Sequence, residues 1–282
     1  MARTPIPRHS KTSEVAKKKA RPRLKRARAR SESGWQVELL RVTAFLSTDL
    51  STKPLWQSAV GSEPSEVIQK PAEKLFQESG PFGENSRLIM TWRPPRIDWI
   101  LSATQEHIVN NRLPFIGGYD DLINKFVSLT KKWLKDCPAL SRLAIGAIVG
   151  YPVADPNRGY KKLDKLLPDV NVPAWGNASD FSYAINRKRN SKKVEIDPPL
   201  SLNRLTKWSC ITTTGYGLFL DPSAGKFQQL ETLPQLSFVR LELDVNTVPR
   251  SPDHHLQNET LIPVFDELCD LAKELMERGD MP

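Results

Sequence analysis

The chain has 282 residues, 41 of them Lys or Arg and 32 Asp or Glu, which gives a formal net charge of +9. With 39% hydrophobic and 26% charged residues, the composition excludes a wholly disordered chain, a collagen and a coiled coil. The longest weakly polar run, residues 143–154, is shorter than the roughly 20 residues that a membrane-spanning helix needs. The three cysteines are widely separated and lie in no C-x-x-C motif, which argues against disulfides and structural zinc. We therefore expect a protein of the reducing cytoplasm that makes no membrane contact.

The positive charge is concentrated in the first 34 residues, which hold 12 Lys or Arg and only Glu14 and Glu32. This segment alone carries +10, so the rest of the chain sums to −1. Residues 17–30 have almost no apolar side chains, their like charges repel, and Pro22 interrupts any helix. We therefore expect residues 1–34 to form a disordered basic arm.

Such an arm binds polyanions by releasing condensed counterions, so its affinity for DNA or RNA should fall steeply with salt. Because it has no aromatic residues and no folded reading element, it cannot specify a base sequence. Its predicted nucleic-acid contacts are Lys17, Lys18, Lys19, Arg21, Arg23, Lys25, Arg26, Arg28 and Arg30. The alternatives are a solubilising tail, a nuclear-import signal and a transit peptide.

A body of strands and helices is predicted after Gly34. Hydrophobic periodicity and turn residues predict, in chain order, a central strand at 35–46, a short helix at 55–60, a hairpin of strands 87–92 and 96–101, a helix at 120–135, and strands at 143–149, 181–185, 208–214, 218–220 and 237–245. A C-terminal helix follows, with Pro263 in its first turn.

Strands followed by a helix thus occur twice. This order predicts an α+β fold in which a mostly antiparallel sheet carries helices on one face. We expect residues 35–282 to form a single domain, with halves 35–150 and 151–282 related by a structural pseudo-duplication.

A resemblance involves the middle of the chain. Residues 131–134 (Lys-Lys-Trp-Leu), at the end of one predicted helix, and residues 140–146 (Leu-Ser-Arg-Leu-Ala-Ile-Gly) are similar to a sporadically distributed family of uncharacterised bacterial proteins. The family ends in a strand and helix similar to residues 237–278, and it usually has a Tyr-Asn pair where this chain has Ile148 to Gly150. The resemblance implies a bacterial source and no particular activity.

No motif singles out a catalytic or metal centre. The segment Asp253-His254-His255 with Glu259 has metal-capable side chains, but adjacent histidines cannot readily reach one ion, so a solvated loop is predicted. There is no G-x-S-x-G sequence, and the glycines at 215 and 217 lack the spacing and the Lys of a phosphate loop. An enzyme would have to use carboxylates such as Asp98. We therefore predict a non-enzymatic protein without a cofactor.

The body is dipolar along its sequence. Residues 156–193 carry a net +6 and residues 231–282 a net −7. The run 187–193 predicts an exposed basic loop and a second nucleic-acid contact, made by Arg187, Lys188, Arg189, Lys192 and Lys193. Nearby aromatic residues, Trp175, Phe181 and Tyr183, are of the kind that stack on bases. The alternatives are that these rings belong to the core and that the acidic C-terminal section receives the basic arm.

A hairpin rich in Trp and Arg offers a surface for a protein partner. Trp92, Arg93, Arg96 and Trp99 are residue types that anchor interfaces, although strand alternation should bury at least one Trp in the core. The sequence therefore predicts a protein that contacts DNA or RNA. The alternative is an interaction or regulatory subunit of a larger bacterial system.

Overall fold

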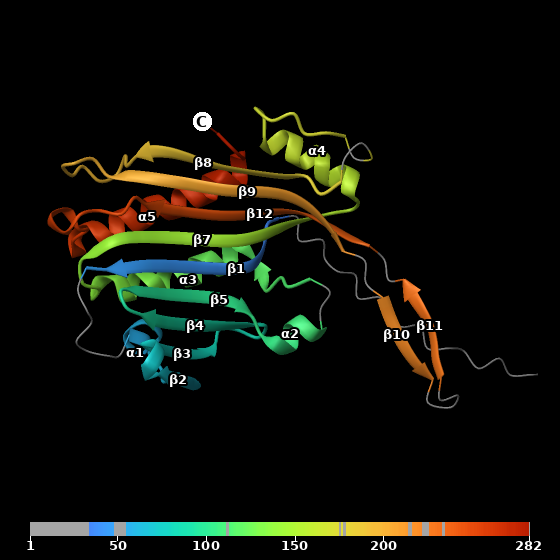
Figure 1. The fold of residues 1–282 in the computed structure, drawn as a ribbon, viewed down its shortest axis with the longest axis horizontal. Helices are drawn as coiled ribbons and strands as arrows, with labels where there is room; N and C mark the ends of the chain where they lie inside the picture. Colours follow the sequence, from blue (N-terminus) through green and yellow to red (C-terminus); the bar gives the residue numbers. More distant parts are fainter. Residues whose placement is uncertain are drawn as a thin grey trace, which may run out of the picture. The chain divides into compact units, whose positions relative to one another are not determined.

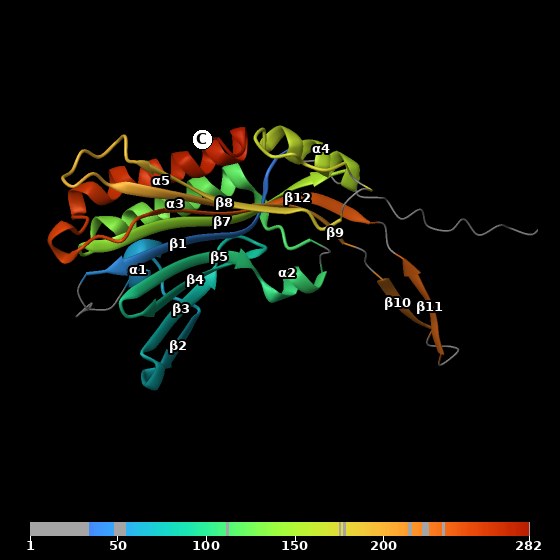
Figure 2. The same cartoon turned by 45° about the horizontal axis from the view of Figure 1, so that its top comes forward.

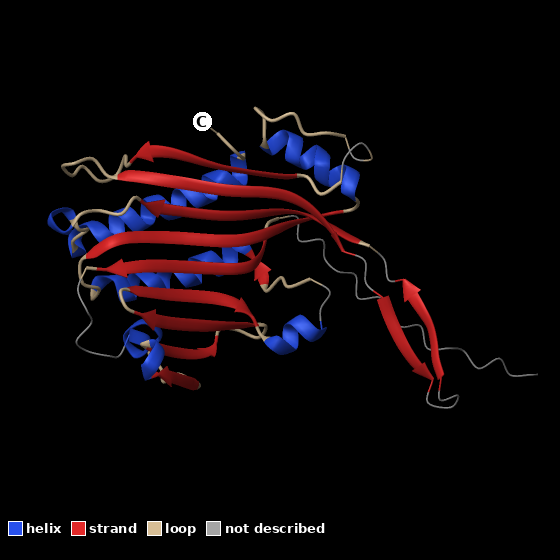
Figure 3. Cartoon of the chain, in the orientation of Figure 1, coloured by secondary structure: helices blue, strands red, loops and turns tan. Residues whose placement is uncertain are grey.

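The computed structural model describes residues 34–281, with gaps at 48–54, 111–112, 175, 177–178, 214–215, 222–225 and 233–234 (Figures 1 and 3). The predicted basic arm therefore lies outside the described residues. In chain order the elements are β1 (Gln36–Leu46), α1 (Leu55–Val60), β2 (Glu66–Lys70), the 3-10 turn η1 (Pro71–Glu73), β3 (Leu75–Pro81), β4 (Ser86–Arg93), β5 (Arg96–Ala103), α2 (Gln105–Asn110), β6 (Gly117–Gly118), α3 (Tyr119–Lys135), β7 (Leu140–Val153), α4 (Pro156–Leu166), β8 (Ser182–Asn190), β9 (Ser201–Thr213), β10 (Tyr216–Asp221), β11 (Lys226–Thr232), β12 (Leu236–Thr247), the 3-10 turn η2 (Pro252–His254) and α5 (Asn258–Arg278).

The strands form a 10-stranded antiparallel sheet in the order β2-β3-β4-β5-β1-β7-β12-β9-β8, and the short β6 pairs with β1. β10 and β11 form a separate two-stranded sheet. The predicted α+β fold with a mostly antiparallel sheet is confirmed. Both halves run from a first strand through a short helix to a meander whose last strand pairs with the first, and a long helix follows. The two halves meet where β1 pairs with β7.

Alternation along the strands sends apolar side chains to one face of the sheet. On β1 these are Leu40, Val42 and Ala44, all fully buried, and the same face of the neighbouring strands is equally apolar. The long helices α3 and α5 lie along this face, as Figure 2 shows, and their Phe126 and Phe265 are fully buried in the same core. Within the described residues, no helix is both long enough and apolar enough to cross a membrane.

Three tryptophans join α1, β5 and α3 in the core of the first half. Trp99 is fully buried and lies between Trp56 and Trp133, with ring centroids 6.0 and 5.9 Å away. The sequence predicts either a partner surface or a core position for Trp99. The partner role is wrong for this residue, because a side chain with 0% exposure offers nothing to a partner.

Two local predictions are wrong. The segment predicted as an exposed loop over 187–193 begins as strand, because Arg187 to Asn190 continue β8 and pair with β9. The C-terminal helix begins at Asn258, so Pro263 stands inside it rather than in the first turn. The first error arises because pairing with β9 extends β8 past the residues whose local pattern indicates a strand.

Gly279, directly after α5, lies close to the backbone of Leu166. Gly279 has a φ of +82°, and a Cβ at this position would lie 1.9 Å from the carbonyl oxygen of Leu166. Gly61 has the same φ but faces open space. We expect Gly61→Ala to lower the free energy of unfolding by about 1–2 kcal/mol, the cost of a left-handed backbone. Gly279→Ala should lower the free energy of unfolding by more than about 3 kcal/mol, because the backbone at Leu166 must also move. Urea denaturation measures both losses. Equal losses would rule out the close approach.

Candidate functional site

The face of the sheet opposite the helices carries rows of polar side chains across the strands. Register pairing places Ile100, Arg41, Gly146, Asp244 and Leu205 side by side on β5, β1, β7, β12 and β9. We call this the open face. Other rows, in the same strand order, contain Asp98, Thr43, Ala144, Asn246 and Asn203, or Ser102, Leu39, Ile148, Glu242 and Lys207. Polar groups of strands far apart in sequence are thus brought together.

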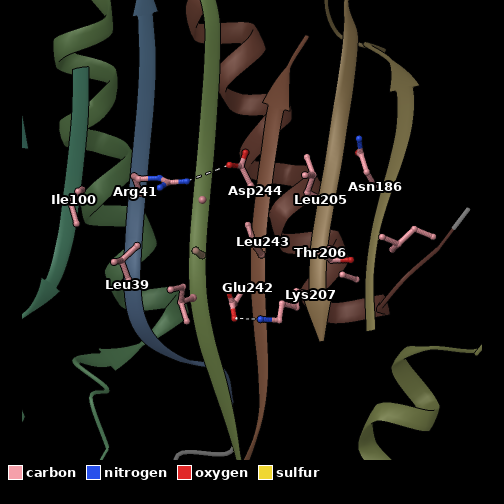
Figure 4. Close-up of a pocket in the computed structure, with 15 residues that line it drawn as sticks. Leu39, Arg41, Ile100, Asn186, Leu205, Thr206, Lys207, Glu242, Leu243 and Asp244 are labelled. Atoms are coloured by element: carbon pink, nitrogen blue, oxygen red, sulfur yellow. Dashed lines mark hydrogen bonds and ion pairs between the residues drawn. The ribbon is translucent and has the colours of Figure 1, made fainter. Parts of the chain in front are cut away.

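A hollow of about 590 Å³ lies in the centre of the open face (Figure 4). Leu39, Ile100, Ile148 and Leu205 contribute apolar surface to it, and Leu205 is 39% exposed. Its volume and mixed lining are those of a site for a small molecule or for one group of a larger ligand.

A guanidinium crosses the hollow over a glycine. Arg41 of β1 reaches past β7 to Asp244 of β12, with Nη2 3.3 Å from Oδ2 (Figure 4). The intervening residue of β7 is Gly146, where a Cβ would lie 3.5 Å from Nη2 of Arg41. A Cβ at this position would make only ordinary van der Waals contact with the guanidinium, which therefore lies directly over the backbone of β7.

Asp244 begins a ladder of hydrogen bonds that runs to the sheet edge. Asn246 Nδ2 donates to Asp244 at 2.8 Å, Asn203 Nδ2 donates to Asn246 at 2.9 Å, and Asn186 Nδ2 donates to Asn203 at 3.2 Å. Asn246 is fully buried, whereas Asn186 is exposed. The amides of Asn246 and Asn203 both donate and accept, so the ladder keeps these groups in fixed orientations.

Charges around the hollow are balanced. Arg240 pairs with Glu38 and with Glu242, and Lys207 Nζ lies 3.4 Å from Glu242. Together with the Arg41–Asp244 pair, these contacts leave no excess charge of either sign among the groups that border the hollow. It therefore suits a neutral group better than an anion.

A second feature of the open face combines cations with an aromatic ring. In one row of register partners, Arg93, Arg96, Phe45 and Arg142 stand on β4, β5, β1 and β7. The guanidinium carbons of Arg96 and Arg142 lie 5.8 and 5.6 Å from the centroid of the Phe45 ring, one from each neighbouring strand. Both distances are within cation–π range.

The three arginines of this row differ in their partners. Arg96 is bound by Asp98, with Nε 2.6 Å from Oδ2, and Thr43 donates to the same carboxylate. Arg93 makes an exposed contact of 3.5 Å with Glu73. Within the part of the chain that the structure describes, Arg142 has no carboxylate partner, and its buried Nε has no acceptor. The row therefore keeps one unneutralised cation.

The predicted basic loop proves to be ion-paired with the C-terminal helix and the residues after it. Arg187 donates to Asp280 through Nε at 2.7 Å and Nη2 at 2.9 Å, and Asp280 is 2% exposed. Arg189 donates to Glu267 of α5 at 2.7 Å, and Glu267 is also 2% exposed. These two arginines are thus partners of buried carboxylates and are not presented on an open loop.

Glu267 accepts hydrogen bonds from several donors. It also accepts from the Ser191 hydroxyl and from the backbone N–H groups of Lys192 and Lys193. Burial alone would raise the pKa of Glu267, but these hydrogen bonds and that of Arg189 outweigh it and lower the pKa below its ordinary value of 4.5. One carboxylate thus fixes the end of β8 and the turn after it.

The other predicted contact residues differ in their exposure and in the groups that they contact. Lys193 pairs with Asp270, whereas Lys188 and Lys192 are exposed and, among the described residues, have no ion-pair partner. Phe181 and Tyr183 pack against the core, as the alternative interpretation held, and Tyr183 donates to Asp280 at 3.3 Å. Trp175 lies outside the described residues. Trp92 is half-buried against the core.

Two cysteine thiols and the possible metal ligands are the remaining chemical groups of interest among the described residues. Burial raises the pKa of Cys137 to about 12 and that of Cys210 to about 11, so neither thiol ionises near neutral pH. No group of three or more His, Cys, Asp or Glu side chains is placed to hold a metal ion in the described ranges.

No family model, curated protein or solved structure matches this chain. The resemblance to a bacterial family therefore stays a prediction. The open face is not among the sites predicted from the sequence. The signal that could have found it was the alternating polar residues of β12 together with Arg41 and Thr43 of β1, since polar positions on one face of central strands indicate a sheet uncovered on that side.

The hydrogen bonds that Glu267 accepts from Arg189 and from the turn after β8 predict both a stability change and a pH dependence. Glu267→Gln should lower the free energy of unfolding by on the order of 3 kcal/mol at neutral pH, since it breaks a buried charge pair. Asp270→Asn, which removes the exposed pair with Lys193, should cost less than about 1 kcal/mol.

A lowered pKa in the folded state means that this stabilisation is complete above about pH 4.5 and is lost as the pH falls through the folded-state pKa. The difference between wild type and Glu267→Gln in thermal unfolding should therefore shrink below pH 4.5. A difference that stays constant with acidification would contradict the role given to the charge.

Proposed function

We propose that this chain is a non-enzymatic protein that contacts DNA or RNA, with residues 17–30 supplying the main electrostatic attraction. The observation that carries the proposal is the segregation of charge, because residues 1–34 hold 12 Lys or Arg against two Glu while the rest of the chain is nearly neutral. The three free cysteines suit a reducing, cytoplasmic setting.

The ion pairs of β8 change the second part of the proposal. Arg187 and Arg189 are held by Asp280 and Glu267, so contact with phosphates would have to break buried pairs. The exposed Lys188 and Lys192 remain available on this edge of the sheet. We therefore assign the secondary contact to these lysines rather than to the whole run.

A protein-binding or regulatory role is the second candidate. The uncovered apolar surface of Leu39, Ile100, Ile148 and Leu205 favours it, because such surface on one face of a sheet is often covered by a partner. Arg93 and Arg96, which the sequence analysis assigned to a partner surface, lie on this same face, whereas Trp99 does not.

We also infer that the two halves of the body are related by a structural pseudo-duplication. Support comes from their shared order of strand, helix, meander and helix, and from the pairing of the last strand of each meander with the first strand of its half.

The salt dependence of binding tests the main proposal. Full-length protein should bind a labelled DNA duplex with an affinity that falls linearly on a log–log plot against salt. In a full-length variant with Gln at the nine basic positions of 17–30, the slope should become shallower by about 0.9 for each phosphate that the protein no longer neutralises. Fluorescence anisotropy at several salt concentrations measures both slopes. Identical affinity and slope for the two proteins would show that residues 17–30 do not contribute to binding.

A further inference from the structure

We propose that the open face is a binding surface for single-stranded nucleic acid. In this arrangement a phosphate contacts Arg142 beside the Phe45 ring, and an unpaired base enters the central hollow. The inference rests on the proposed function and states where on the folded body the strand lies and which form of nucleic acid it must be.

The Phe45 row has the chemistry of a phosphate-binding and stacking site. Arg142 is the cation without a carboxylate partner among the described residues, and its guanidinium is held beside the Phe45 ring rather than extended into solvent. A side chain fixed in this way loses little rotational freedom when a phosphate binds. Four adjacent strands cover about 14 Å, enough for a few nucleotides of an extended strand.

The hollow has the chemistry of a base-binding site. Its charges are paired within the protein, so it does not favour a phosphate, and Leu39, Ile148 and Leu205 offer an apolar floor to the face of a ring. The exposed amide of Asn186 and the guanidinium of Arg41 stand beside this floor (Figure 4), where side chains of these types can bond to base edges.

The two parts lie on one continuous surface. Phe45 and Arg41 point to the same face of β1 and are four residues apart, a distance of about 13 Å along a strand. A single strand can therefore reach both. A duplex cannot use the hollow, because its bases are already paired and stacked, so the open face should discriminate between the two forms.

Two pairs of substitutions test the surface in the full-length chain. Arg142→Gln removes the unpaired cation of the row, and Lys165→Gln removes one exposed charge on α4 as its control. Leu205→Asp places a charge in the floor of the hollow. Val67→Asp is its control, because Val67 is an exposed apolar residue of β2 outside the hollow. All four sites are at least partly exposed, and thermal unfolding checks that each variant is folded.

Binding is measured by anisotropy with labelled oligo(dT), oligo(U) and a DNA duplex of the same length. Arg142→Gln should weaken single-strand binding by about fivefold at low salt and make the salt slope shallower by about 0.7. Leu205→Asp should weaken it by about tenfold, the loss expected when one base contact is removed. Duplex binding by both variants, and single-strand binding by both controls, should change less than about twofold.

The outcomes separate the inference from the function on which it rests. If Arg142→Gln and Leu205→Asp behave as their controls do, while Gln at the nine basic positions of 17–30 abolishes binding, the open face is not the site although the proposed function stands. That result would also direct attention to a protein partner for the face. If full-length wild type binds neither single strand nor duplex, the proposed function itself is wrong.

Discussion

Within the described residues, the long helices α3 and α5 pack on one face of the sheet, and this constraint determines most of what the rest of the described body does. Because side chains alternate, each central strand must send apolar residues to α3 and α5 and present its other residues to the uncovered side. The polar residues cannot be placed independently, since register pairs them across strands. Arg41 reaches across Gly146 to Asp244, and Asn246 donates to Asp244 and accepts from Asn203. The open face is thus a consequence of one-sided burial and antiparallel register.

Charge in this protein acts in two different ways. In the body, the basic run of 156–193 and the acidic run of 231–282 look like separate surfaces along the sequence, but β8 and α5 bring them together. Arg187 and Arg189 face carboxylates with 2% exposure, which holds an edge strand against a helix that is 21 residues long. Net charge by segment therefore overstates the free charge of the folded body. Residues 17–30 differ in kind, because they contain no acidic side chain that could neutralise them internally.

Local pattern was sufficient for the fold class and for the elements with strong periodicity. The alternating apolar residues of β12 and the helical stripe of α3 could be identified from the sequence, and both are confirmed. Prediction failed where the local signal is weak or where a feature depends on distant partners. α4 was missed although Asp155 caps it and Pro156 follows, because its apolar face is only Tyr160, Leu163 and Leu166. The pairing of particular residues across the open face could not be derived, because register between β1 and β12 passes through β7 and no local pattern encodes it.

Under the proposed function, residues 17–30 and the open face should respond differently to salt. A contact made only through lysines and arginines loses its free energy as counterions become abundant, and it treats single strands and duplexes alike apart from their charge density. A base held against Leu39, Ile148 and Leu205 gains its free energy from burial, which salt weakens little. Raising the salt should therefore weaken the phosphate contacts of residues 17–30 and of Arg142 first and leave the contribution of the proposed base contact in the hollow. Preference for single strands over duplex should then grow with salt concentration, although total affinity falls, because only the face distinguishes a free base from a paired one.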